Sequence, residues 1–350
     1  MLGLSSGLMW EGFISVEAGL SPNEINDTTD HTCLAWYDFT DETTMYTDAG
    51  STNVSSDSDA IYRITNKSSA SGGDRYTTYV QQPNGSAFRP KYKINGQGGK
   101  SYANFNGNYT YIGGNRSNTE NRVGNAGSSN NFSDQDSIQS DEIAVFFVSA
   151  GYEGADSGPA NFRRAVFGLR NWQDNGSGNN DKVHLYAYND ALTSPFATHD
   201  VFLQLDPYPQ ATSTDVGVEA EPPIFGASSD FKITSFLTEE NEEKAHLAIG
   251  NNIGDTAVKF NLSSTDYYHY GVKSFSAGGP FEIDLTSTSN NTYFRIGADG
   301  NDTTSPTQYW TGDIYEVIIM KGDMYTDGTY QDIINYLINK YGDNGEGYGP

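Results

Sequence analysis

The clearest strand and helix patterns of apolar positions lie near the C-terminal end of the chain. Residues 309–320 are rich in β-branched and aromatic side chains, the composition that favours a strand. After a turn signal at residues 321–323 the period becomes that of a helix, with apolar positions at Ile333, Ile334, Leu337, Ile338 and Tyr341. Gly342 is placed to end this helix. The pattern predicts a long core strand, a turn and a short C-terminal helix that packs on the body.

Shorter strand patterns run through the rest of the chain. Residues 143–150 (IAVFFVSA) are almost continuously apolar, which is typical of a strand in a sandwich core. Similar short runs occur at 34–39, 61–65, 102–105, 109–112, 162–169, 183–188, 201–205, 231–237, 244–249, 257–262, 280–285 and 293–296. The Asn106-Gly107-Asn108 segment between two of these runs predicts a hairpin. About a dozen strands and one helix predict an all-β fold, an antiparallel two-sheet sandwich of the jelly-roll kind.

Three stretches resemble a known family. Residues 310–319 (WTGDIYEVII), followed by 336–342 (YLINKYG), resemble the end of a LamG or concanavalin A-like jelly roll, in the version found in virion proteins of tailed bacteriophages. Residues 34–39 (LAWYDF) resemble the first strand of that family, and 90–107, ending in YANFNG, resemble a later strand and turn. The resemblance spans residues 33–342. It implies a concanavalin A-like fold and a place in a virion.

The first 30 residues form a predicted N-terminal arm. They follow neither a strand nor a helix period, yet they carry apolar residues whose exposure to water would be a liability: Leu8, Met9, Trp10, Phe13 and Ile14. We expect this extended arm either to pack on its own domain or to insert into a partner. Residues 31–342 are the predicted jelly roll, with long loop insertions at about 113–140 and 206–230, and 343–350 are a flexible tail.

Composition and charge exclude several functions. The formal net charge is −25, so phosphate backbones and anionic lipids are repelled, and we expect neither a nucleic-acid partner nor a membrane partner. No stretch approaches the ~20 apolar residues that a membrane span needs. Cys33 is the single cysteine, which excludes an intramolecular disulfide and a cysteine metal site. The first basic residue is Arg63, so the start of the chain lacks the basic segment of a secretory leader.

The sequence predicts no catalytic site. Glucanases of this fold carry a Glu-x-Asp-x-x-Glu strand, and the nearest match here is residues 282–287 (EIDLTS). Glu282 and Asp284 would share one strand face, but Ser287 stands where the family keeps its acid/base glutamate. Hydrolysis of a glycosidic bond needs two carboxyl groups, so that role does not carry over. Nucleophile-elbow, Walker and HExxH motifs are absent, and the five histidines are scattered.

Glycans and calcium are the candidate ligands. A flat aromatic face beside amide or carboxylate side chains is a common sugar site, and two segments expected in loops offer one: Asn171, Trp172 and Asp174, and Tyr267, Tyr268 and Tyr270. Aromatic residues of a sandwich are more often core, which is the alternative for both segments. No motif requires a cofactor, but the acidic turn of Asp299, Asn301 and Asp302 has the oxygen ligands that Ca²⁺ prefers.

The sequence favours a non-enzymatic structural protein of a phage virion. The expected roles are capsid decoration or a tail or collar appendage, with the jelly roll displayed outward toward host surface glycans. The expected partners are other virion proteins, through the arm, and further copies of this chain in a homo-oligomer. A free-standing carbohydrate-binding protein of a bacterial surface is the alternative, and a glycoside hydrolase is a weaker one because of Ser287.

Overall fold

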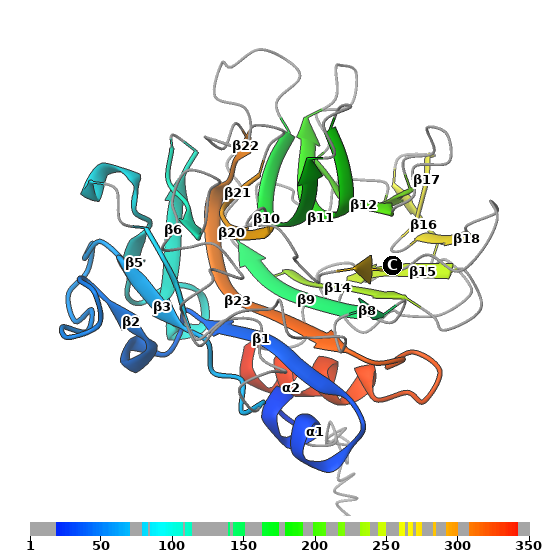
Figure 1. Cartoon of the computed structure of the whole chain (residues 1–350), viewed down its shortest axis with the longest axis horizontal. Coiled ribbons are helices and arrows are strands. Elements are labelled where there is room, and N and C mark those ends of the chain that lie inside the picture. The colour runs from blue at the N-terminus through cyan, green and yellow to red at the C-terminus, as the bar shows by residue number, and fades with distance from the viewer. Residues whose placement is uncertain are drawn as a thin grey trace, which may run out of the picture.

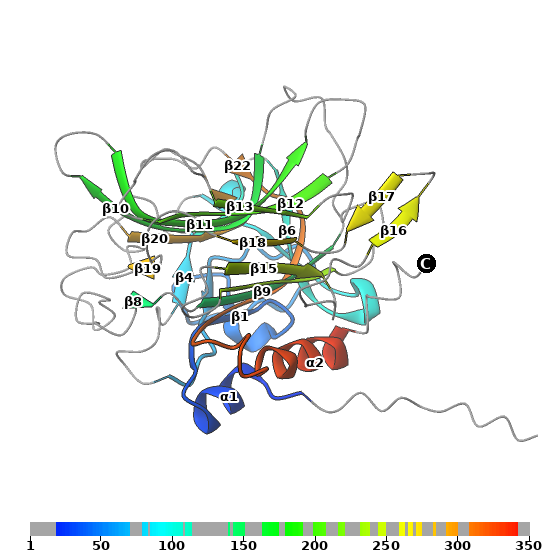
Figure 2. The same ribbon diagram turned by 90° about the vertical axis from the view of Figure 1, so that its right-hand side faces the viewer.

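The computed structural model describes parts of the chain between residues 19 and 341. The described residues are 19–70, 79–82, 85–107, 109–113, 139–140, 143–150, 163–174, 179–191, 199–207, 216–220, 232–238, 244–249, 259–262, 265–268, 271–274, 283–284, 292–299 and 308–341. Two eight-stranded sheets face each other, and two α-helices lie against the outer face of one of them (Figures 1 and 2). The fold is therefore the predicted two-sheet sandwich with a short C-terminal helix.

The first sheet is built around the long strand that the sequence predicts. Its order is β18 (Gly271–Ser274), β15 (Lys244–Ile249), β14 (Lys232–Thr238), β9 (Ile143–Ala150), β23 (Thr311–Lys321), β6 (Tyr102–Asn106) and β5 (Lys91–Lys93). β1 (Thr32–Asp38) also pairs with β23. All of these pairings are antiparallel, and β23 pairs along most of its length with β9, in the register Val317 opposite Phe147. The strand that resembles the family motif is thus a central strand.

The second sheet covers the inner face of the first. Its order is β13 (Val216–Ala220), β12 (His199–Pro207), β11 (Asn179–Ala191), β10 (Arg163–Asp174), β20 (Thr292–Ile296) and β7 (Ile112–Gly113). β22 (Gln308–Tyr309) pairs in parallel with β10 and antiparallel with β21 (Ala298–Asp299). Smaller sheets join β2 (Met45–Tyr46), β3 (Arg63–Thr65) and β4 (Tyr79–Gln81), β16 (Lys259–Leu262) and β17 (Thr265–Tyr268), and β8 (Gln139–Ser140) and β19 (Ile283–Asp284). Short 3-10 turns are η1 (Glu42–Thr44), η2 (Ser86–Phe88) and η3 (Gln97–Gly99).

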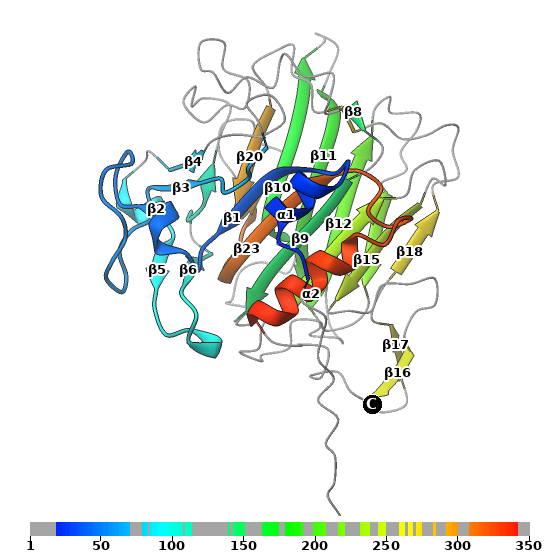
Figure 3. The same ribbon diagram turned by 90° about the horizontal axis from the view of Figure 1, so that it is seen from below.

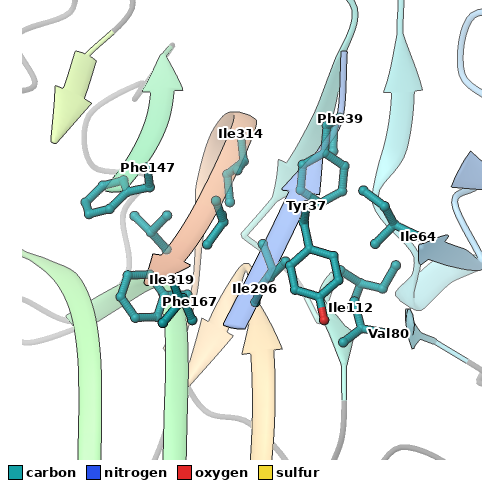
Figure 4. Packing of buried hydrophobic residues seen from close by; sticks show 14 of the residues in the cluster. Tyr37, Phe39, Ile64, Val80, Ile112, Phe147, Phe167, Ile296, Ile314 and Ile319 are labelled. Carbon is teal, nitrogen blue, oxygen red and sulfur yellow. The ribbon is translucent and has the colours of Figure 1, made fainter. Parts of the chain in front are cut away.

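The main core fills the space between the sheets. Val317 and Ile319 of β23 point into it, as alternate side chains on one face of a strand do. A register shift between Ile314 and Glu316 brings Ile314 to the same face. Phe147 of the first sheet meets Phe167 of the second at a ring-centroid distance of 5.8 Å (Figure 4). This contact between the sheets explains why apolar strand patterns occur in both halves of the chain.

A second apolar cluster lies on the outer face of the first sheet, under the helices. α2 (Tyr330–Tyr341) buries the five residues of the predicted stripe, and this confirms the helix. α1 (Pro22–Thr28) begins with a capping box between Ser21 and Glu24 and buries Ile25 completely. Both helices cross the sheet beneath β1 and β23 (Figure 3). Within the described part of the chain, no helix is long and apolar enough to cross a membrane.

Several expectations from the sequence need correction. Residues 102–105 and 109–112 do not form a hairpin, because β6 pairs with β23 and β5 in one sheet while β7 pairs with β20 in the other. The last part of the predicted arm contains α1, since Ser21 caps a helix and Ile25 finds a place in the core. β12 and β13 extend into the predicted loop at 206–230. Residues 1–18, 114–138 and 342–350 lie outside the described part of the chain.

Candidate functional site

An exposed aromatic cluster lies where the chain passes from the first sheet to the second. Phe88, at the end of η2, and Tyr109, between β6 and β7, are 39% and 60% exposed. They are two of the three large apolar side chains that are exposed among the described residues, and they touch each other. Tyr309 of β22 and Tyr111 complete the group, which we call the Tyr109 surface. Contiguous exposed aromatic side chains are a mark of a binding surface.

The backbone around Tyr109 is held in a conformation that few residues adopt. Gly107 has φ 72° and Tyr109 has φ 67°, in the left-handed region that a residue with a large side chain usually avoids. The Gly107 amide donates to the carbonyl of Trp310, the residue between β22 and β23, at 2.9 Å, which ties the turn to this part of the fold. The Thr110 hydroxyl holds the other side of the turn. It accepts from the backbone amide of Asn106 at 2.9 Å and donates to the side-chain oxygen of Asn106, also at 2.9 Å. The surrounding structure thus enforces a strained conformation that projects Tyr109 outward.

The rings of the Tyr109 surface brace one another edge to face. The Phe88 and Tyr109 centroids are 6.2 Å apart at an interplanar angle of 69°, and those of Tyr109 and Tyr309 are 5.3 Å apart at 64°. Tyr111 is buried and lies 6.3 Å from Tyr309. Aromatic pairs favour such arrangements, because the positive edge of one ring meets the negative face of the other. Tyr109 is therefore fixed by two rings while most of its own surface stays in water.

Polar contacts hold the base of this surface in place. The Tyr111 amide donates to the Phe88 carbonyl at 3.2 Å, and the Gln82 side-chain amide donates to the Tyr111 carbonyl at 3.2 Å. Burial, reinforced by Tyr111, raises the pKa of Tyr309 to about 12, so this phenol keeps its proton at neutral pH. The surface can thus offer an aromatic face and phenol hydrogen-bond donors to one ligand.

A second concentration of chemistry lies under α2, on the helix side of the first sheet. Glu316 of β23 is completely buried, and each of its oxygens accepts two hydrogen bonds. Oε1 accepts from Trp36 Nε1 at 2.6 Å and from Tyr336 Oη at 3.1 Å. Oε2 accepts from Lys340 Nζ at 2.8 Å and from Tyr341 Oη at 2.6 Å. We call these residues, with Asp38 and Lys67, the Glu316 network.

Asp38 is the second carboxylate of the Glu316 network. It lies opposite Glu316 across the β1–β23 pair and accepts from Lys340 Nζ at 2.8 Å and Lys67 Nζ at 3.0 Å. Burial opposes the charge of Asp38, but the two lysines outweigh it and hold its pKa below the usual value. Burial, together with the charge of Asp38, raises the pKa of Glu316 despite Lys340. Side chains of the protein already donate hydrogen bonds to both carboxylates, Asp38 and Glu316, and three of these donors lie on α2. The network therefore holds α2 on the sheet and presents no acid/base pair to a substrate.

Asp313 is a third carboxylate with a perturbed pKa. It lies on β23 toward β6, and its Oδ1 accepts from Asn104 Nδ2 at 2.7 Å. Burial raises its pKa to about 6, against the hydrogen bond from Asn104 and the charge of Lys93. Asp313 therefore changes charge near neutral pH.

The structure does not gather the sequence-predicted site residues into one site. Asn171, Trp172 and Asp174 lie at the end of β10 and Tyr267 and Tyr268 in β17, so both segments are strands where loops were expected. Asp299 ends β21. Tyr270, Asn301 and Asp302 lie outside the described residues, as do all five residues of the arm: Leu8, Met9, Trp10, Phe13 and Ile14. Their binding roles stay predictions.

The Tyr109 surface was missed because its residues are distant in sequence. Phe88, Tyr109 and Tyr309 come from three segments that only the sheet topology brings together. The nearest sequence signal was Asn106-Gly107, which marks a turn, but Tyr109 was assigned to the following strand. A backbone turn with φ above zero at a tyrosine cannot be deduced from residue type.

Comparisons with known proteins give only distant likenesses. No family model matches the chain, and a search of curated proteins finds no similar sequence. Similar solved structures include the CBM40 of the Ruminococcus gnavus IT-sialidase bound to α2,3-sialyllactose, with TM-score 0.35, 9% identity and coverage of 54% of this chain and 80% of that one. Domain 4 of the Geobacillus stearothermophilus arabinanase AbnA, in complex with arabinotriose, has TM-score 0.38, 11% identity and coverage of 87% and 98%.

A tailspike of a bacteriophage is also among the similar structures. Full-length tailspike protein 2 from an Escherichia coli O157:H7 bacteriophage has TM-score 0.38 and 12% identity, with coverage of 70% of this chain and 26% of that one. At such TM-scores these likenesses carry no argument about ligand or role. The sandwich is therefore assigned from the chain's own sheets, and function from its own residues.

Proposed function

We propose that this chain is a non-enzymatic glycan-binding jelly roll whose Tyr109 surface stacks against a sugar ring. One observation carries the proposal: Tyr109 is 60% exposed although its backbone is strained and two rings and a locked turn hold it in position. Strain and exposure of a large apolar side chain both cost stability, so a binding role is a reason for them to persist.

Sugar chemistry fits this surface. One face of a pyranose ring presents C–H groups that pack on an aromatic ring, while its hydroxyls need hydrogen-bond partners at the edge. Tyr309 supplies a protonated phenol beside Tyr109. The net charge of −25 disfavours nucleic acid as the ligand of exposed aromatic rings.

Two observations favour binding without catalysis. The buried carboxylates of the Glu316 network are occupied by protein donors, and Ser287 stands where the glucanase motif that residues 282–287 resemble has its acid/base glutamate. A glycosidase needs two carboxyl groups on either side of the scissile bond. Release of reducing ends from any glycan that the protein binds would contradict this part of the proposal.

A place on a phage virion is the second part of the proposal. It is supported by the sequence resemblance of residues 310–342 and by the position of the two ends of the described fold. Gly19, where the arm enters the body, packs against the backbone of α2 so closely that a Cβ would contact Asp332 and Tyr336. Figures 1 and 2 show β22, which carries Tyr309, on the side of the molecule away from α1 and α2. Attachment through the arm would thus leave the Tyr109 surface facing outward.

A glycan array tests the binding function. We expect full-length protein to bind at least one class of glycan and Tyr109→Ala to lose about tenfold or more in affinity. Ile94→Ala is the matched control, because Ile94 is also exposed (41%) and apolar but is not part of the Tyr109 surface. Absence of binding, or equal binding by Tyr109→Ala, would refute the proposal.

Sedimentation with particles tests the virion part. Full-length protein and a deletion of residues 1–18, which keeps α1 and its capping box, would each be mixed with virions that lack this protein. We expect only the full-length chain to co-sediment, with both forms folded by circular dichroism. If neither form binds particles, the free-standing bacterial surface protein is the better interpretation, and the glycan-binding proposal is unaffected.

A further inference from the structure

We infer that the Tyr109 surface recognises a single uncharged pyranose residue, such as the end or a branch of a glycan, and not the flat face of a polysaccharide. This inference rests on the glycan binding proposed above and names the class of ligand. It follows from the orientation, exposure and electrostatics of the rings.

The ring orientations exclude a flat platform. A linear polysaccharide that lies on a protein stacks successive sugars on aromatic rings that share one plane. Tyr109 stands at 69° to Phe88 and at 64° to Tyr309, so neither neighbour can continue a plane that Tyr109 begins. With centroids only 6.2 and 5.3 Å away, the two neighbours contact the ring of Tyr109 and form walls beside it. One sugar ring can stack there, and the next along a chain meets no second coplanar ring.

The exposed fractions of the rings also indicate a single stacking face. Tyr111 is only 4% exposed, and Tyr309 is partly buried between it and Tyr109. Phe88 is 39% exposed, against 60% for Tyr109. Tyr109 is therefore the principal stacking face, while Tyr309 contributes its phenol group and Phe88 an apolar wall. This division of roles suits a ligand with one apolar face and a polar rim.

The electrostatics favour an uncharged sugar. Arg295, the basic side chain whose charge acts on Tyr309, is completely buried and cannot reach a ligand on the surface. The guanidinium of Arg89, next to Phe88 in the sequence, lies 4.6 Å from the centroid of the Tyr62 ring and donates to the Gln82 carbonyl at 3.1 Å. It is thus engaged with other partners than the Tyr109 ring. The phenol of Tyr309, like an ordinary tyrosine, is uncharged at neutral pH, and the net charge of −25 repels anionic glycans at long range.

Calorimetric titration of the full-length protein with a defined panel tests the inference. The probes are the methyl pyranosides of glucose, galactose, mannose and N-acetylglucosamine, their soluble oligosaccharides of increasing length, and methyl glucuronide as an acidic probe. We expect at least one neutral methyl pyranoside to bind and its Kd to change by less than about threefold with chain length. We also expect Kd to stay constant between about 0.05 and about 0.5 M NaCl, and Tyr109→Ala to weaken the binding by about tenfold or more.

Three results would overturn the inference while leaving glycan binding intact. They are an affinity that rises about tenfold or more with chain length, retention of the protein on insoluble cellulose, mannan or chitin, and a preference for methyl glucuronide that fades with salt. Binding to no member of the panel and to no glycan on an array would overturn the inference together with the proposed function. Tyr109→Phe separates stacking from hydrogen bonding, because it keeps the ring, and we expect it to retain most of the affinity.

Discussion

Replacement of Lys340 by methionine tests the interpretation of the Glu316 network as a clamp. Lys340 Nζ lies 2.8 Å from Asp38 Oδ2 and 2.8 Å from Glu316 Oε2, and the side chain is only 16% exposed. Methionine keeps a chain of similar length that can pack under α2, but it removes the charge. Glu316, which is completely buried, then loses the one cation that contacts it among the residues that the structure describes, while Asp38 keeps Lys67 at 3.0 Å.

The expected loss of stability is large. Removing one partner of a buried ion pair typically costs about 3–5 kcal/mol, because the remaining charge stays in a medium of low polarity. Since Asp38 keeps one lysine and Glu316 keeps its Trp and Tyr donors, we expect about 3 kcal/mol for Lys340→Met. Lys93→Met is the control. Lys93 Nζ and Asp57 Oδ2 are 3.0 Å apart, but their side chains are 29% and 47% exposed. Lys93→Met should therefore lower the free energy of unfolding by less than about 1 kcal/mol.

Urea unfolding at two pH values is the assay. The raised pKa of Glu316 means that its folded form binds a proton more tightly than its unfolded form, so its contribution to stability is full at acidic pH and is lost as pH rises through the folded pKa. Loss of Lys340 raises this pKa further. The deficit of Lys340→Met should therefore be larger at pH 8 than at pH 5, where Glu316 can take up a proton.

A double variant makes the prediction stricter. Glu316→Gln removes the buried charge and keeps the side-chain shape, so Lys340→Met combined with Glu316→Gln should recover about 2 kcal/mol relative to Lys340→Met alone. A double variant as unstable as the single one, or a deficit no larger than that of Lys93→Met, would refute the idea that charge pairing holds α2 on the sheet.

Other consequences follow from single positions. Burial raises the pKa of Asp313 to about 6, so its stabilising contribution is present below about 4 and is lost as pH rises through 6. Asp313→Asn should thus raise the free energy of unfolding at pH 8 by about 1–2 kcal/mol and leave it unchanged near pH 4, and an equal effect at both pH values would contradict the assignment. Gly107→Ala should lower stability by about 1–3 kcal/mol in thermal unfolding, since φ is 72° and a Cβ would contact Thr311. Gly85→Ala is the comparison, because open space surrounds Gly85, and an equal loss there would exclude conformational strain as the cause.

The sequence predicts the elements better than their pairing. β9, β15 and α2 follow from periodicity alone, because a continuous apolar run or a helical stripe has few other solutions. The predicted hairpin between β6 and β7 was wrong. The Asn106-Gly107 signal specifies a turn, but it does not specify the strands with which the segments before and after the turn pair. The long β23 offers β6 a larger apolar partner than the short β7 does.

The candidate sites could be predicted least. Asp38 and Lys340 are 302 positions apart, and nothing local to either residue indicates the other. Trp172 was expected in a loop, but β11 extends the pairing of β10 through residues 172–174. The Tyr109 surface depends on three segments and on a positive φ, both of which are results of the tertiary fold.

The most direct test of the proposed site is an NMR titration with a glycan identified on the array. Full-length protein labelled with ¹³C in its tyrosine rings gives signals for 24 tyrosines, and Tyr109→Phe assigns the signal of Tyr109. We predict that the Tyr109 and Tyr309 ring signals shift together and saturate with the same Kd as calorimetry. A glycan that shifts Tyr267 and Tyr268 while Tyr109 stays unchanged would place binding at the segment first predicted from the sequence and contradict the site proposed from the structure.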